Sequence, residues 1–157
     1  MSRIELFHLR RVRNKPLATA LLAQHAGLTA DEALAVVHQA VGGGKPQVAV
    51  PGDDADAAAR RLIVALADTG FIARRSVADG FDAAQHASAA LAAVLPRCSP
   101  ALADAAGARL LQGDWMQALD MALQHLHMHR PANDPDRQRL QQAAIDCGLV
   151  RGVPGRV

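Results

Sequence analysis

The sequence predicts an α+β protein in which a small β-α-α-β-α-β module with a three-stranded sheet is followed by an all-helical C-terminal half. Three short β-compatible stretches occur in the first half of the 157 residues, and segments with helical periodicity separate them. Beyond Asp79-Gly80 every segment has helical periodicity. We therefore expect the module to span residues 1–78, a helical region to span 79–150, and a flexible tail to span 151–157.

The N-terminal segment contains the first strand and two helices. Residues 4–9, IELFHL, are β-compatible. Pro16 can open a helix because its missing N–H would be unpaired there, and this helix is expected to end near Gly27. Thr29, with Glu32 three positions later, has the pattern of a capping box. This pattern predicts a second helix that ends at the glycines of 42–44.

The rest of the module contains two more strands and a long helix. Residues 47–50, QVAV, lie between Pro46 and Pro51, which predicts a strand at the edge of the sheet because proline cannot donate to a ladder. An aspartate at 53 or 54 caps a helix that continues to residue 68. Gly70 ends that helix, and residues 71–76 form the third strand.

The second half is expected to be entirely helical. Proline, glycine and aspartate turns divide it, and the predicted helices are 82–95, 99–112, 113–129 and 134–148. One of them carries a core stripe made of Trp115, Ala118, Leu119, Ala122 and Leu126. This half either completes the core of the first module or forms a homodimer.

Composition excludes some classes of protein. Apolar residues make up 50% of the chain, which has three Phe, one Trp and no Tyr, so a surface that stacks on nucleic-acid bases is not expected. The net charge of +2 is too small to require a polyanionic partner. No apolar run approaches about 20 residues, and the first residues lack the apolar core of a secretory signal. We expect no membrane association, a cytoplasmic location and reduced thiols at Cys98 and Cys147.

Several motifs of the module carry a family resemblance. The turn Asn14-Lys15 leads from the first strand into a helix, and residues 27–33, GLTADEA, open the second helix. The long third helix and its exit carry Leu62, Leu66 and Gly70. With these motifs, residues 1–76 resemble the C-terminal domain of the large-subunit ribosomal stalk protein, whose fold is shared with the ClpS protease adaptors.

The resemblance implies a fold and an interaction surface. Stalk domains recruit translation GTPases through lysines on their first two helices, and the corresponding positions here are Ala20, Asp31 and Leu34. ClpS adaptors have an Asn-Asp pair after the first strand, where this chain has residues 13–15, RNK. The resemblance therefore implies the fold rather than the ribosomal role. A protein partner is expected at the surface formed by Leu21, Leu28, Asp31 and Leu34, and the alternative is that these leucines pack internally.

A basic cluster near the N-terminus suggests a second kind of partner. It consists of Arg10, Arg11, Arg13 and Lys15, which could attract phosphate groups or bind nucleic acid weakly. Further arginine pairs at 60–61 and 74–75 would extend this basic face on one side of the sheet. The alternative is a solvated strand end and loop.

Two histidines form the best candidate metal site. His125 and His129 are four residues apart, so they share one helix face and could chelate one ion. Additional ligands could come from Asp134, Asp136, Met121 or Met128. The alternative is that histidine is favoured at the end of a helix by the helix dipole.

Recognisable catalytic patterns are missing from the sequence. Residues 42–46, GGGKP, lack the first glycine and the Ser or Thr of a phosphate loop. Cys98 follows Arg97, which favours a lowered thiol pKa, but no Cys–His or Ser–His–Asp arrangement can be assembled. We expect a non-enzymatic interaction or adaptor module without a cofactor, and the basic cluster and the histidine pair supply two alternative functions.

Overall fold

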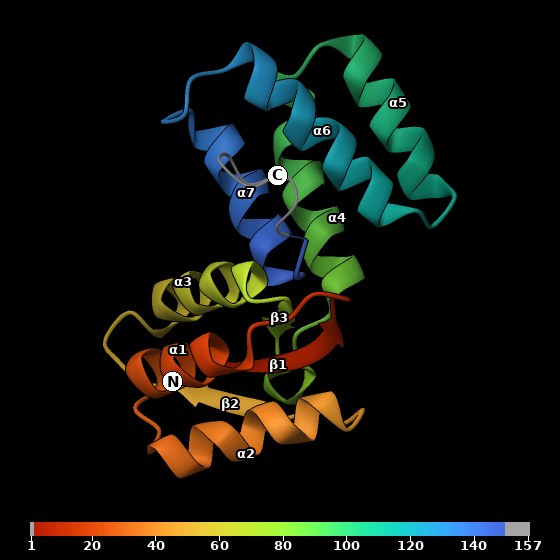
Figure 1. Cartoon of the computed structure of the whole chain (residues 1–157). Coiled ribbons are helices and arrows are strands. Elements are labelled where there is room, and N and C mark those ends of the chain that lie inside the picture. The colour runs from red at the N-terminus through yellow and green to blue at the C-terminus, as the bar shows by residue number, and fades with distance from the viewer. Residues whose placement is uncertain (1, 150–157) are drawn as a thin grey trace. The chain divides into compact units, whose positions relative to one another are not determined.

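The computed structural model describes residues 2–149, which form two compact units that divide between Phe81 and Asp82 (Figure 1). The first unit combines a three-stranded sheet with helices, and the described part of the second is helical. The predicted α+β class is confirmed. Within residues 2–149, no helix combines the length and the apolar character needed to cross a bilayer. The predicted tail, 151–157, lies outside the described residues.

The first unit has the predicted β-α-α-β-α-β order. Its elements are β1 (Ser2–Leu9), α1 (Lys15–Ala26), α2 (Ala30–Val41), β2 (Gln47–Val50), α3 (Ala55–Asp68) and β3 (Phe71–Arg75), followed by the short 3-10 helix η1 (Val77–Asp79). The strand order is β2-β1-β3, and β1 is antiparallel to both neighbours. The short strand β2 therefore lies at the sheet edge, as its flanking prolines predict.

The two faces of the sheet differ in chemistry. Ile4 and Leu6 of β1 are buried, and they share one face with their strand partners Val48 and Ala73. Helices α2 and α3 contact β1, and α1 packs against both of these helices. On the alternate positions of β1, Glu5 lies opposite Arg74 of β3. The apolar face is thus the one that the helices cover, and the other face carries an ion pair.

Side-chain caps begin the helices of the first unit. Asn14 Oδ1 accepts a hydrogen bond from Leu17 N at 3.1 Å, which satisfies one of the unpaired amides at the start of α1. Thr29 and Glu32 form the predicted capping box at α2, with both reciprocal hydrogen bonds at 3.1 Å. Gly27, at φ +68°, ends α1 in the left-handed conformation.

The connection from β1 to α1 passes directly over Gly70. Arg10 N donates to Gly70 O, and Asn14 N donates to Thr69 O, both at 2.8 Å. Gly70 has φ +85°, and a β-carbon there would clash with the carbonyl oxygen of Val12. Only glycine permits this close approach of backbone to backbone.

The second unit packs four helices around an alanine- and leucine-rich core. They are α4 (Ala83–Val94), α5 (Pro100–Leu111), α6 (Trp115–His129) and α7 (Pro135–Asp146), with the 3-10 helix η2 (Leu95–Arg97) after α4. Helix α6 packs against the other three, and α4 also packs against α7. The predicted stripe on α6 is buried from Ala118 to Leu126, whereas Trp115, the first residue of the helix, is only half-buried.

Replacing Gly70 with alanine should destabilise the protein strongly. Gly70→Ala combines an unfavourable φ with the clash against Val12 O, and we expect a loss of about 3 kcal/mol or more in the free energy of unfolding. Gly27→Ala is the matched control, because Gly27 also has positive φ but a β-carbon there meets nothing within 4 Å. It should lose only about 1 kcal/mol. Equal losses in urea unfolding would contradict the close approach.

Candidate functional site

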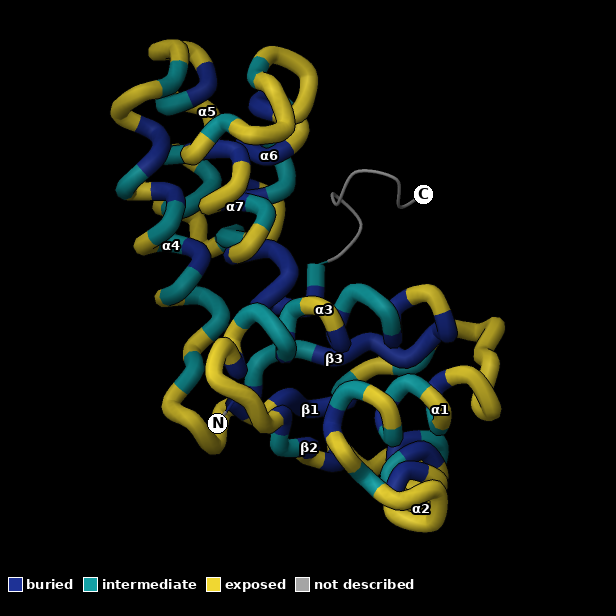
Figure 2. The backbone as a smooth tube through the Cα atoms, turned by 90° about the vertical axis from the view of Figure 1, so that its left-hand side faces the viewer, coloured by how far each residue is buried: buried dark blue, intermediate teal, exposed yellow. Residues whose placement is uncertain are grey.

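The helix pair α1–α2 carries the four residues of the predicted partner surface. Leu21 and Leu28 are half-buried, while Asp31 and Leu34 are exposed, Leu34 to 42%. Most of α2 is exposed (Figure 2). Leu21 and Leu28 are therefore partly packed inside the unit, as the alternative interpretation expects. Leu34 is exposed, as the prediction of a partner surface expects.

Leu17, which was not among the predicted residues, adds a further exposed leucine to the helix pair. It is 45% exposed and lies one turn before Leu21, so both side chains share a face of α1. The spacing of four residues was the signal that could have identified it. We define the hairpin surface as Leu17, Leu21, Leu28, Asp31 and Leu34.

The inner faces of the same helices are already filled. The buried side chains of α1 are Ala18, Leu22 and Ala26, and those of α2 are Ala33, Val37 and Ala40. These positions recur at helical spacing and make the contact between the two helices and the rest of the unit. The exposed leucines are therefore additional to the packing of the module.

The predicted basic cluster lies on the connection between β1 and α1 and at the first residue of α1. Arg10, Arg11, Arg13 and Lys15 are all exposed, and no ion pair involves them in the described part of the chain. Arg13 and Lys15 line an open hollow of about 580 Å³ that Asp68 and Thr69 border. The backbone contacts with Thr69 and Gly70 hold this segment in place.

The two arginines of β3, Arg74 and Arg75, are each paired with an acid. Arg74 Nε lies 2.7 Å from Glu5 Oε1, and its guanidinium lies 4.3 Å from the centre of the Phe7 ring. Arg75 pairs with Asp56 at 2.9 Å. These ion pairs reduce the positive charge that residues 74–75 would add to the predicted basic face.

The two candidate metal ligands do share a face of α6. The ring centroids of His125 and His129 are 4.4 Å apart. Within residues 2–149, however, no group of three or more His, Cys, Asp or Glu side chains is arranged to hold a metal ion. The structure thus brings together two ligands of the predicted set, which is fewer than a structural or catalytic zinc site needs.

The aspartates proposed as further ligands are bound by arginines instead. Arg97 Nε donates to both carboxylate oxygens of Asp136, at 3.1 and 3.0 Å. Arg130 Nη1 donates to Asp134 at 3.1 Å, and its other terminal nitrogen donates to the carbonyl oxygen of Arg97 at 3.0 Å. The prediction that Asp134 or Asp136 completes a metal site with the histidines is corrected by this network.

The network shifts the acid–base properties of its members. The hydrogen bonds from Arg97 hold the pKa of Asp136 below its ordinary value, and the charges of Arg97 and Arg130 lower it further. Burial raises the pKa of the Cys98 thiol, and the nearby arginines do not overcome this effect. The predicted lowering of the Cys98 pKa is therefore wrong, and the raised pKa disfavours a reactive thiolate.

A comparison with known protein families, curated proteins and solved structures finds no match to this chain.

Asp136 should make stability dependent on acid pH. Because its pKa is lower in the folded state, its contribution is complete above the unfolded-state value of about 4 and is lost as the pH falls through the folded-state pKa. Asp136→Asn should lower the free energy of unfolding by about 1–2 kcal/mol at pH 7. The loss should be no larger because the Arg97 side chain is 58% exposed, and solvent therefore screens its attraction to Asp136. The difference from wild type should shrink below about pH 4.

The control for this prediction is Asp104→Asn on α5. Asp104 is exposed and forms no ion pair among the described residues, so its replacement should change stability by less than about 0.5 kcal/mol. A difference between wild type and Asp136→Asn that stays constant from pH 7 to pH 3 would contradict the assigned role of Asp136.

Proposed function

We propose that the chain is a non-enzymatic interaction module that binds a protein partner through the hairpin surface. The observation that carries this proposal is the exposure of Leu17 and Leu34 on helices whose inner faces are already filled. Burial of apolar area is favourable by about 25 cal/mol per Å². A partner that covers these leucines would therefore form a complex stabilised by their burial. Grouped exposed apolar side chains are typical of protein-binding sites.

The remaining features of the hairpin surface suggest the chemistry of the partner. Asp31 adds a negative charge beside the leucines, and it lies in the first turn of α2. An apolar partner surface with a positively charged rim fits this arrangement, because complementary rim charges speed association and exclude wrong partners. The partner is either another protein or a second copy of this chain.

We also propose that the first unit is related in fold to the ribosomal stalk C-terminal domain and the ClpS adaptors. The β-α-α-β-α-β order, the positive φ of Gly27 and the capping box at Thr29 support it. We further propose a cytoplasmic location, a compartment in which thiols such as those of Cys98 and Cys147 stay reduced. No step of the proposed function requires a cofactor.

Replacing the exposed leucines should abolish partner capture without unfolding the protein. We expect Leu17→Ser/Leu34→Ser to melt within a few degrees of wild type, since neither side chain belongs to the buried face of its helix. Capture of the partner from a cytosolic extract by the tagged full-length chain should fall about tenfold or more.

Leu111→Ser is the matched control, because Leu111 is a 92% exposed leucine on α5. It should capture the same proteins as wild type, with mass spectrometry as the readout. If the double variant and wild type capture the same set in equal amounts, the hairpin surface is not the binding site.

The basic cluster supports a second candidate function, the weak binding of phosphate-rich polymers. Four exposed cations lie on a segment anchored by backbone hydrogen bonds, and two of them border an open hollow. Clustered lysines and arginines bind nucleic acids through counterion release, with little dependence on sequence. The same segment would recognise phosphate groups in any polymer that presents several of them.

Two of these arginines should control retention on heparin. Arg11→Gln/Arg13→Gln should elute at clearly lower salt than Lys45→Gln/Arg139→Gln, although both variants have the same net charge and replace exposed side chains. For duplex DNA, the slope of log affinity against log salt should fall in magnitude by up to about two. Equal elution of the two variants would show that net charge alone governs retention.

A further inference from the structure

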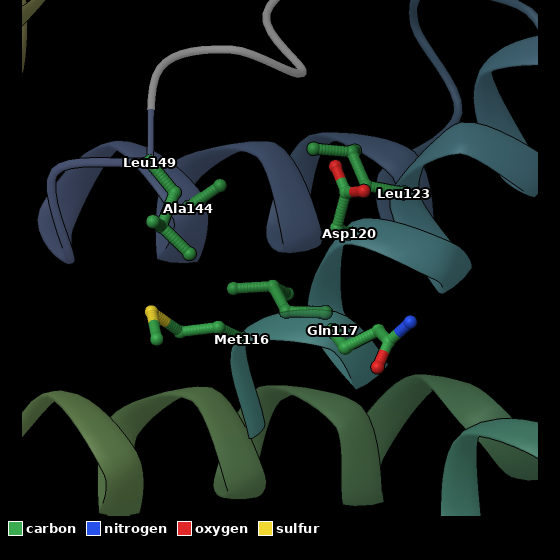
Figure 3. Close-up of a pocket in the computed structure, with 7 residues that line it drawn as sticks. Met116, Gln117, Asp120, Leu123, Ala144 and Leu149 are labelled. Carbon is green, nitrogen blue, oxygen red and sulfur yellow. The ribbon is translucent and has the colours of Figure 1, made fainter. Parts of the chain in front are cut away.

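A cavity of about 290 Å³ opens between α6 and the C-terminal end of α7 (Figure 3). Met116, Leu119 and Leu123 follow one another at helical spacing on α6, so a single face of this helix forms one wall. Ala144 and Leu149 contribute the opposite wall. The volume lies just below the range of about 300–1,000 Å³ typical of small-molecule sites, so the cavity suits a small ligand.

Most of the cavity wall is apolar and adaptable. Leu119 and Leu123 are buried, and Leu149 is half-buried. Met116 is 51% exposed and, in Figure 3, extends beneath Ala144 and Leu149. An unbranched thioether can follow the shape of different ligands. An apolar ligand body would therefore be removed from water on several sides.

Asp120 is the charged residue among those that line this cavity. Asp120 is half-buried, and its Oδ2 accepts a hydrogen bond from Gln124 Nε2 at 3.1 Å. Within residues 2–149, no cationic side chain forms an ion pair with Asp120. A carboxylate offers about four acceptor positions, and the single bond from Gln124 leaves most of them available to a ligand.

We propose that this cavity binds a small molecule with an apolar body and a protonated amino group. The body lies between Leu119, Leu123 and Leu149, and the ammonium group pairs with Asp120. Charge complementarity selects this class, because a carboxylate ligand of the same shape would place like charges together beside an apolar wall. The cavity belongs to the second unit and the hairpin surface to the first, so this inference does not depend on the proposed function.

The test is an NMR titration of the full-length protein with three molecules of matched shape: phenylpropylamine, phenylpropanol and phenylpropanoate. We expect amide shift changes concentrated in α6 and at the end of α7, and binding of the amine about tenfold or more tighter than that of the carboxylate. Asp120→Asn should reduce amine affinity at least about fivefold, to the level of the alcohol. The affinity for the alcohol should be unchanged by this substitution.

Asp104→Asn on α5 is the control and should leave all three affinities unchanged. Equal binding of amine and carboxylate would overturn the proposal, and so would an amine preference that survives Asp120→Asn. Saturable shifts confined to another region, or no shifts for any of the three molecules up to their solubility limits, would overturn it as well.

Discussion

The first unit depends on one close backbone approach, where the segment after β1 crosses Gly70. The amides of Arg10 and Asn14 donate to the carbonyls of Gly70 and Thr69, and the missing side chain of Gly70 makes room for Val12 O. This contact links the end of the central strand to the turn between α3 and β3. It also places Asn14 to cap α1. This contact therefore fixes where α1 begins and where the basic cluster lies, and the buried face of α1 then packs against α2 and α3.

Small side chains explain why leucines remain available on the hairpin surface. Four of the six buried positions of α1 and α2 are alanines, namely Ala18, Ala26, Ala33 and Ala40. Alanine buries little area, so these helices gain stability through close packing rather than through large apolar side chains. Leu17 and Leu34 are not needed to fill the core, and they face solvent. Their exposure is the observation on which the proposed partner surface rests.

Local signals made the fold predictable, whereas the sites depend on tertiary contacts. Pro16, the Thr29–Glu32 pair and Gly70 act within a few residues, and each marks an element boundary that the structure confirms. The pairings of Arg74 with Glu5 and of Arg97 with Asp136 join residues far apart in the sequence. Sequence spacing alone therefore placed Arg74 in a basic face and Asp136 in a metal site. It also predicted that Arg97 lowers the pKa of the Cys98 thiol. The cavity beside Asp120 is formed by two helices and has no sequence motif. Charge pairing therefore cannot be derived from composition alone.

The claim that the hairpin surface binds a protein is tested most directly by photo-crosslinking in cells. A benzoylphenylalanine introduced at position 34, on the exposed side of α2, should form a discrete covalent adduct with one protein, and mass spectrometry would identify it as a partner or as a second copy of the chain. The same probe at position 111, which is also exposed, should not form this adduct. Absence of an adduct at position 34, or the same adduct at both positions, would contradict the account.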